Sequence, residues 1–212
     1  MTFTRIDRGT WPREEYFRHY FTQVPCTYSA VFKLDITRLR RQGQKLYPSM
    51  VFYLSTVVNR HQEFRMALDE EGNPGYYDIV HPCYTVFHKE TETFSNLWTA
   101  YTPDYRAFCA AWEKDMRDYG GCPGLMSRPD TPANTFPVSM VPWASFEGFN
   151  LNLQNGYDYL PPIFTVGRFY EEGDRVLLPL AVQVHHGVCD GFHLCRLVKE
   201  LQELLNSCDR QE

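Results

Sequence analysis

The chain has 212 residues and a mass of 24.9 kDa, which suffices to bury one large core without disulfides or metals. A net charge of -5, with a pI near 5.8, provides no basic surface for nucleic acid. No apolar stretch of the sequence approaches the roughly 18 to 20 residues needed to cross a bilayer. We therefore expect one globular domain over residues 1–212, with neither nucleic acid nor a membrane as partner.

Cysteine usage points to a reducing compartment. The seven cysteines are scattered, odd in number and without a Cys-x-x-Cys pair. The first residues contain no apolar secretory segment. These features predict a cytoplasmic protein.

Caps, turns and apolar spacing predict the elements of the first half. Thr10, followed by Pro12 and two acids, is typical of a helix start, because the helix dipole favours acids there. Apolar residues recur at helical spacing after Pro48. The expected elements are a helix over 10–20, a strand over 27–36, a helix over 48–59, and strands over 76–80 and 84–88.

The second half is predicted to contain two helices and four strands. A helix over 104–119 ends at Gly120-Gly121, and the proline-rich stretch 120–137 follows as an irregular connection. Helices that alternate with antiparallel hairpins indicate an α/β fold, a two-layer sandwich of a mixed, largely antiparallel sheet with packed helices. The remaining expected elements are strands over 138–140, 146–153, 163–170 and 175–185, and a closing helix from residue 191 or 192 to about 206.

A run of titratable residues lies between the last expected strand and the closing helix. Its sequence is His185-His186-Gly187-Val188-Cys189-Asp190-Gly191-Phe192-His193. A sharp strand-to-helix turn can direct such side chains into a cleft, so this run is the candidate active site. An imidazole with a pKa near 6.5 can accept a proton from a hydroxyl or thiol at neutral pH. A general-base histidine is therefore the favoured interpretation.

Two other chemistries remain open for the same run. His185, Cys189 and His193 are spaced by four residues and could bind a metal on one helix face, although Asp190-Gly191 interrupts a helix there. Cys189 could act as a nucleophile beside a histidine, but a buried structural thiol is commoner in apolar surroundings. For His185 and His193 we expect structural roles.

The run closely resembles the signature of type A chloramphenicol acetyltransferases, in which alanine commonly replaces Gly187. The broader His-x-x-x-Asp-Gly pattern also occurs in the acyltransferase cores of 2-oxoacid dehydrogenase complexes, but those carry lipoyl domains that we do not find in this sequence. The resemblance covers essentially the whole chain. Its blocks include Trp11-Pro12-Arg13-Glu14-Glu15-Tyr16-Phe17, Glu63-Phe64-Arg65-Met66-Ala67, Thr85-Val86-Phe87-His88, Pro142-Trp143-Ala144-Ser145-Phe146 and Pro162-Ile163-Phe164-Thr165.

The resemblance implies an enzyme that acetylates the 3-hydroxyl of chloramphenicol, with acetyl-CoA as cosubstrate and no metal, and so confers antibiotic resistance. It implies that His186 is the general base in a direct attack, and that Ser145 donates a hydrogen bond to the tetrahedral oxyanion. Thr165 would order water near that intermediate. Tyr20 would contact the drug in the acceptor pocket.

The resemblance also implies how the site is supported. Asp190 would pair with Arg13 and hold the histidine turn in shape, in a fold like that of other CoA-dependent acyltransferases. The assembly implied is a homotrimer with active sites between subunits. Two alternatives remain: the same mechanism with another small hydroxyl, amine or thiol acceptor, and a drug-binding protein without turnover, against which His186 and Ser145 argue.

Overall fold

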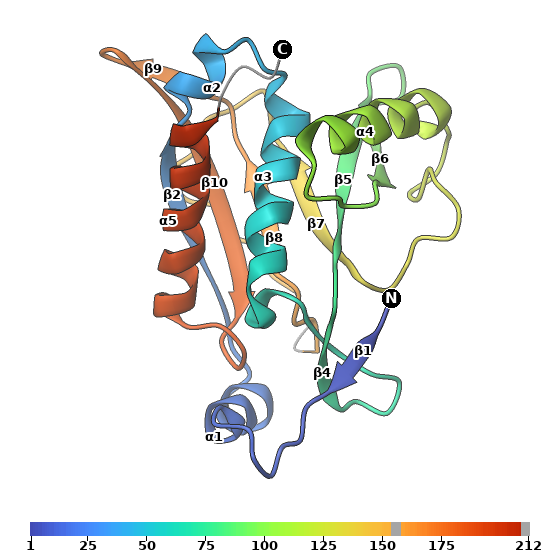
Figure 1. Ribbon diagram of the computed structural model, residues 1–212, viewed down its shortest axis with the longest axis vertical. Helices are drawn as coiled ribbons and strands as arrows, with labels where there is room; N and C mark the ends of the chain where they lie inside the picture. Colours follow the sequence, from blue (N-terminus) through green and yellow to red (C-terminus); the bar gives the residue numbers. More distant parts are fainter. Residues whose placement is uncertain (154–157, 209–212) are drawn as a thin grey trace.

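The computed structural model describes residues 1–153 and 158–208. Among these residues, seven strands form one sheet in the order β2-β10-β8-β7-β5-β6, with β9 paired to β10 outside this path. Helices α3, α4 and α5 lie across one face of the sheet (Figure 1). The predicted α/β architecture is thereby confirmed. The sheet is mixed, because β7 runs parallel to both β5 and β8 whereas β10 is antiparallel to β2, β8 and β9.

The helices and strands have the following bounds. The helices are α1 (Glu14–Arg18), which continues as a π-helix (His19–Gln23), α2 (Thr37–Arg41), α3 (Leu46–Arg60), a 3-10 turn (Gln62–Phe64), α4 (Tyr105–Tyr119) and α5 (Gly191–Ser207). The strands of the large sheet are β2 (Thr27–Asp35), β5 (His81–His88), β6 (Thr93–Trp98), β7 (Thr135–Met140), β8 (Ile163–Val166), β9 (Tyr170–Glu172) and β10 (Arg175–His185). A smaller sheet contains β1 (Phe3–Arg5), β3 (Met66–Leu68) and β4 (Pro74–Tyr77).

The core lies between the sheet and its helices. Helix α3 is buried over most of its length, and α5 buries one stripe at helical spacing: Leu194, Leu197, Leu201 and Leu205. Strand β10 lies between β2 and β8, and its residues from Leu177 to His185 are buried. The uninterrupted apolar part of this stretch, from Leu177 to Val182, is expected of a strand covered on both faces. No helix in the described part of the chain is long and apolar enough to pass through a bilayer.

Four expected elements differ from the structure. The strand expected over 76–80 is found at Pro74–Tyr77 as β4, and residues 78–80 lie outside it. Residues 146–153 were expected to form a strand but have no regular structure; the Leu151 amide there donates to the Gln183 side chain instead of to a neighbouring strand. The expected strand over 163–170 is divided into β8 and β9, where the Gly167 and Arg168 amides bond outside the ladder. The first helix begins at Glu14, because the Thr10 hydroxyl bonds Asp7 and does not cap the helix.

Candidate active site

The histidine turn, residues 186–190, is fixed by backbone hydrogen bonds at the end of β10. The His186 amide donates to the carbonyl oxygen of Cys26 over 2.9 Å, which ties the turn to the residue before β2. The amides of Val188 and Cys189 donate to the His185 carbonyl over 3.1 and 3.0 Å. The turn therefore presents His186 from a rigid base.

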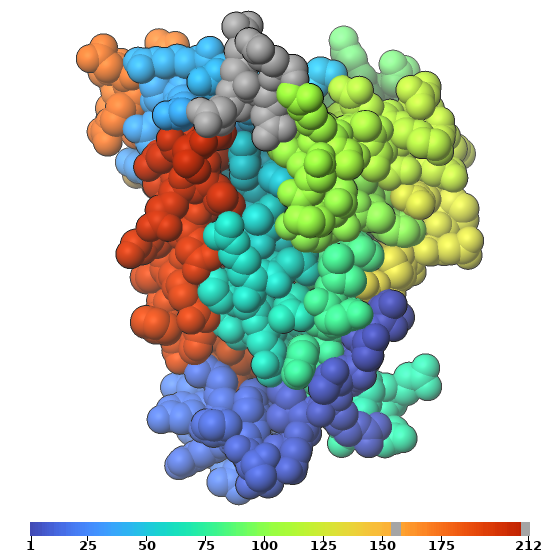
Figure 2. Space-filling model, viewed as in Figure 1, coloured from blue at the N-terminus to red at the C-terminus, as the bar shows by residue number. Residues whose placement is uncertain are grey.

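Arg13 supports the turn from the segment before α1. Its guanidinium donates to the carbonyl oxygens of Gly187 (3.0 Å) and His186 (3.2 Å) and to the Asp190 carboxylate (2.9 Å). Figure 2 shows the N-terminal segment, in dark blue, packed beside the start of α5. The structure thus brings Arg13, His186 and Asp190 together.

Asp190 also begins helix α5. One carboxylate oxygen accepts from the Phe192 amide over 3.2 Å, and His193 completes a capping box with Asp190. Burial works against ionisation of this carboxylate, but the hydrogen bond from Arg13 and the charges of His193 and Arg13 outweigh it and lower the Asp190 pKa. The Asp190 carboxylate therefore stabilises both the histidine turn, through Arg13, and the first turn of α5.

Arg13→Ala is expected to lower the free energy of unfolding by about 1–3 kcal/mol, because two turn carbonyls and the carboxylate lose a charged donor. The turnover number should fall with it, since the histidine turn loses a support. Urea unfolding and a turnover assay measure the two effects. Arg18→Ala on the exposed side of α1 is the matched control. Unchanged stability and rate in Arg13→Ala would contradict the supporting role.

The contribution of Asp190 to stability should depend on pH. A carboxyl group with a lowered pKa in the folded state stabilises fully above its unfolded pKa of about 3.9 and loses that contribution as pH falls through the folded value. The stability difference between the parent and Asp190→Asn should therefore be largest near pH 7 and shrink below about pH 4. Urea unfolding across that range tests this; a constant difference would show that the charge of Asp190 is not involved.

The imidazole of His186 lies between two tyrosine rings. Tyr20, on the π-helix, stacks on it with ring centroids 3.9 Å apart and an interplanar angle of 13°. Tyr28 approaches edge-on, with centroids 5.2 Å apart. The His186 Nδ1 atom is buried and has no hydrogen-bond partner among the described residues. Stacking, more than hydrogen bonding, orients this ring.

The absence of a side chain at Gly187 leaves space for the ring of His185. A Cβ atom at this position would lie 3.0 Å from two atoms of the His185 ring and 3.3 Å from the Phe17 ring. The Gly187 amide donates to His185 Nδ1 over 3.0 Å. His185 is thus a packed, buried neighbour of the turn.

An apolar cavity of about 600 Å³ lies between the β5–β6 hairpin, α4, β7 and the segment after β7. Thr165, from β8, lines it, and Ser139 on β7 pairs with Thr165 in the sheet register. The Ser139 hydroxyl forms no hydrogen bond with another residue that the structure describes. The other lining residues are mostly aromatic or aliphatic and include Tyr47, Trp112, Met140, Trp143, Phe149 and Leu151.

Ser145 lies elsewhere. Its side chain is exposed, and it does not line the cavity. Ser139 is a serine of the cavity lining that the sequence analysis did not single out. Alternation along β7 buries Phe136 and Val138 in the core and turns Ser139 to the opposite face, and this pattern could have identified it.

The candidate residues fall into two groups within one chain. Arg13, Tyr20, His186 and Asp190 surround the histidine turn, whereas Ser139 and Thr165 line the cavity. Thr165 is paired with Ala181 on β10, and His186 follows five residues later. At about 3.3 Å per residue, His186 lies roughly 17 Å along the strand from Thr165.

The structure gives little support to the two alternatives for the histidine run, a metal site and a cysteine nucleophile. His185, Cys189 and His193 do not gather as ligands, and no group of three or more His, Cys, Asp or Glu side chains suited to a metal occurs in residues 1–153 and 158–208. Burial raises the pKa of the Cys189 thiol to about 12, so it carries almost no thiolate at neutral pH. A cysteine nucleophile is therefore disfavoured.

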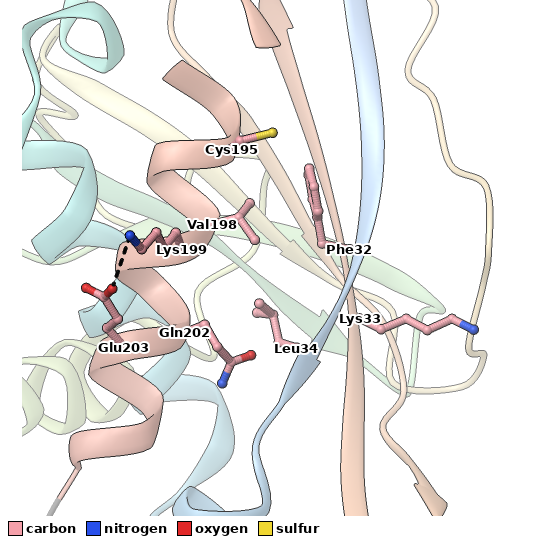
Figure 3. A pocket seen from close by; sticks show the side chains of 8 residues that line it. All are labelled: Phe32, Lys33, Leu34, Cys195, Val198, Lys199, Gln202 and Glu203. Carbon is pink, nitrogen blue, oxygen red and sulfur yellow. Dashed lines mark ion pairs between the residues drawn. The ribbon is translucent and has the colours of Figure 1, made fainter. Parts of the chain in front are cut away.

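A second hollow, of about 400 Å³, lies between α5 and β2 (Figure 3). Phe32, Leu34 and Val198 point into it, and Lys199 and Glu203 face each other on α5 (Figure 3). None of the expected site residues lines this hollow.

Comparison with known proteins gives a consistent result. A family model described as chloramphenicol acetyltransferase matches residues 1–202. A chloramphenicol acetyltransferase of Campylobacter coli is 58% identical over 206 residues, which are 97% of this chain and 100% of the relative.

Solved structures show the same fold. One chloramphenicol acetyltransferase matches with a TM-score of 0.83 at 21% identity, covering 96% of this chain and 100% of the other. The dihydrolipoamide acetyltransferase of Azotobacter vinelandii matches with a TM-score of 0.64 at 14% identity, covering 86% and 82% of the two chains.

Proposed function

Because this chain belongs to the chloramphenicol acetyltransferase family, we propose that it transfers the acetyl group of acetyl-CoA to the 3-hydroxyl of chloramphenicol and so inactivates the antibiotic. The observation that carries the proposed chemistry is the presentation of His186, whose ring is stacked on Tyr20 at the end of a rigid turn. A fixed imidazole at a strand-to-helix turn is suited to general-base catalysis. Acetyl-CoA is a substrate here, and no step requires a metal.

In the proposed mechanism, His186 removes the proton from the drug's hydroxyl as its oxygen attacks the thioester carbonyl. A tetrahedral oxyanion forms. Its collapse breaks the carbon–sulfur bond, and the CoA sulfur takes the proton from the imidazolium, so that the acetylated drug and CoA leave. No acetyl-enzyme is formed, which agrees with a Cys189 thiol whose pKa is raised to about 12 by burial.

Ser139 is proposed as the hydrogen-bond donor to the oxyanion, in place of Ser145. It lines the cavity beside Thr165 and has a hydroxyl with no hydrogen-bond partner in the described chain, whereas Ser145 is exposed outside the cavity. Thr165 is proposed to order water near the intermediate. A preorganised donor of this kind is worth most where water is excluded, as in an apolar cavity.

The active site is proposed to form between copies of the chain, in a homotrimer. The separation of roughly 17 Å along β10 keeps His186 away from Thr165 and from its sheet partner Ser139 in the same chain. If His186 of one copy enters the cavity of a second, base and oxyanion donor can meet at one substrate. Tyr20, stacked on His186, would then face the drug from the same side as the base.

The direct test is release of the CoA thiol by the purified protein with acetyl-CoA and chloramphenicol. Release that depends on the drug supports the proposal. Release without an acceptor would indicate thioester hydrolysis. No release with chloramphenicol, but release with another small alcohol, amine or thiol, would move the function to that acceptor, and tight drug binding without any release would indicate a binding protein.

A further inference from the structure

Ser139 lies where β7 separates from one of its two neighbours. Strand β7 pairs with β5 only as far as Tyr84 and Val138. On its other side, β7 continues to pair with β8 through Ser139 and Met140. The backbone from Ser139 onward therefore has no ladder partner on β5, and Val138 is the last residue of β7 that pairs with that strand.

Two side-chain hydroxyls, from Tyr47 and Thr85, form hydrogen bonds with the β7 backbone next to Ser139, where the pairing with β5 ends. The Tyr47 hydroxyl lies 3.3 Å from the Val138 carbonyl oxygen and 3.1 Å from that of Thr85, and these two oxygens share its single hydrogen. The Met140 amide donates to the Thr85 hydroxyl oxygen over 3.3 Å. One hydroxyl thus holds the residue before Ser139, and the other holds the residue after it.

The two hydroxyls also support each other. Their oxygens are 3.4 Å apart, so the Thr85 hydroxyl can donate to Tyr47 while it accepts from Met140. Burial raises the pKa of Tyr47, which keeps its hydroxyl protonated and able to donate. The Tyr47 ring is itself fixed by edge-on contacts with Tyr84 and Trp112, at 6.0 and 6.5 Å between centroids.

We infer that Tyr47 and Thr85 are positioning residues for the oxyanion donor: together they hold the β7 backbone on both sides of Ser139 and set where its hydroxyl lies in the cavity. The inference rests on the proposed role of Ser139. An oxyanion donor acts over a narrow range of distances, and a misplacement of about 1 Å can cost roughly a hundredfold in rate. Two weak hydrogen bonds at this point can therefore affect catalysis more than stability.

The test is a double-mutant cycle between Thr85→Val and Ser139→Ala, with turnover measured at saturating acetyl-CoA and chloramphenicol. Thr85→Val keeps the shape of the side chain and removes the hydroxyl. In the parent chain it should lower kcat by at least about tenfold. In the Ser139→Ala background it should cost less than about twofold, because the group that it positions is already absent. Tyr47→Phe should behave in the same way.

Two further variants separate positioning from loss of fold. Thr85→Ser retains the hydroxyl and should restore most of the rate. Thr56→Val, a partly buried threonine on α3 that also bonds a carbonyl and a tyrosine, should keep the parent rate. Thermal unfolding of each variant shows whether it is folded.

The possible failures are distinguishable. If Ser139→Ala retains full activity, the proposed role of Ser139 fails and the positioning role fails with it. If Ser139→Ala is impaired but Thr85→Val costs the same factor in both backgrounds, only the positioning role is overturned. A Thr85→Ser variant as slow as Thr85→Val would also overturn it.

Discussion

Replacing His186 with alanine is expected to lower kcat by roughly 10²- to 10⁴-fold, the range attributed to a positioned general base. The ring makes no hydrogen bond through its buried Nδ1 within the described residues, and its main contacts are Tyr20 and Tyr28. The fold of the turn depends instead on backbone bonds and on Arg13, which the substitution leaves in place. Steady-state turnover and a thermal unfolding curve measure the two properties.

His61→Ala is the matched control for that experiment. His61 is a partly buried histidine outside the histidine turn, and its imidazole bonds the Glu200 carboxylate over 2.8 Å. Its loss should affect stability with little effect on turnover. A folded His186→Ala protein that turns over at nearly the parent rate would rule out the general-base mechanism.

Replacing Ser139 with alanine is expected to lower kcat by about 10²- to 10³-fold, the usual cost of losing one oxyanion donor. Ser145→Ala should leave kcat within about twofold, because that side chain is exposed and outside the cavity. The comparison is sharp, since both changes remove one hydroxyl from the same region of the chain. Rates of CoA release under identical conditions decide between the two serines.

The reverse result is equally informative. Loss of activity in Ser145→Ala, with an active Ser139→Ala protein, would show that the exposed segment after β7 moves into the site when substrates bind. Ser145, the serine that the family resemblance had suggested, would then be the donor to the oxyanion.

The sequence predicted best those elements whose pattern is set by their own burial. Helices α3 and α5 follow from apolar residues at helical spacing, and β10 follows from a continuous apolar run before the histidine turn. These elements form the centre of the fold, where the hydrophobic pattern and the tertiary contacts agree. The turn itself was identified because its titratable residues are adjacent in sequence.

Other parts depend on contacts that a local pattern does not contain. The aromatic and aliphatic residues of 146–153 resemble a strand, but they lie against the cavity and the Gln183 side chain. Strand β6 was missed because its outward Phe94 is about half exposed, so its alternation is blurred. Ser139 gains its significance only from pairing with Thr165, a residue 26 positions later, and that register is a property of the folded sheet.

The separation of the histidine turn from the cavity changes what a single defective copy would do. In the proposed trimer, each reaction centre draws its base from one chain and its oxyanion donor from another. A chain that lacks His186 would still lend a working cavity to its neighbour, and a chain that lacks Ser139 would still lend a working base. In a cell with two alleles of the gene, one coding for a chain without His186 and the other for a chain without Ser139, mixed trimers would therefore contain some complete reaction centres. Under the proposed function, such a cell would be resistant although neither chain is active by itself.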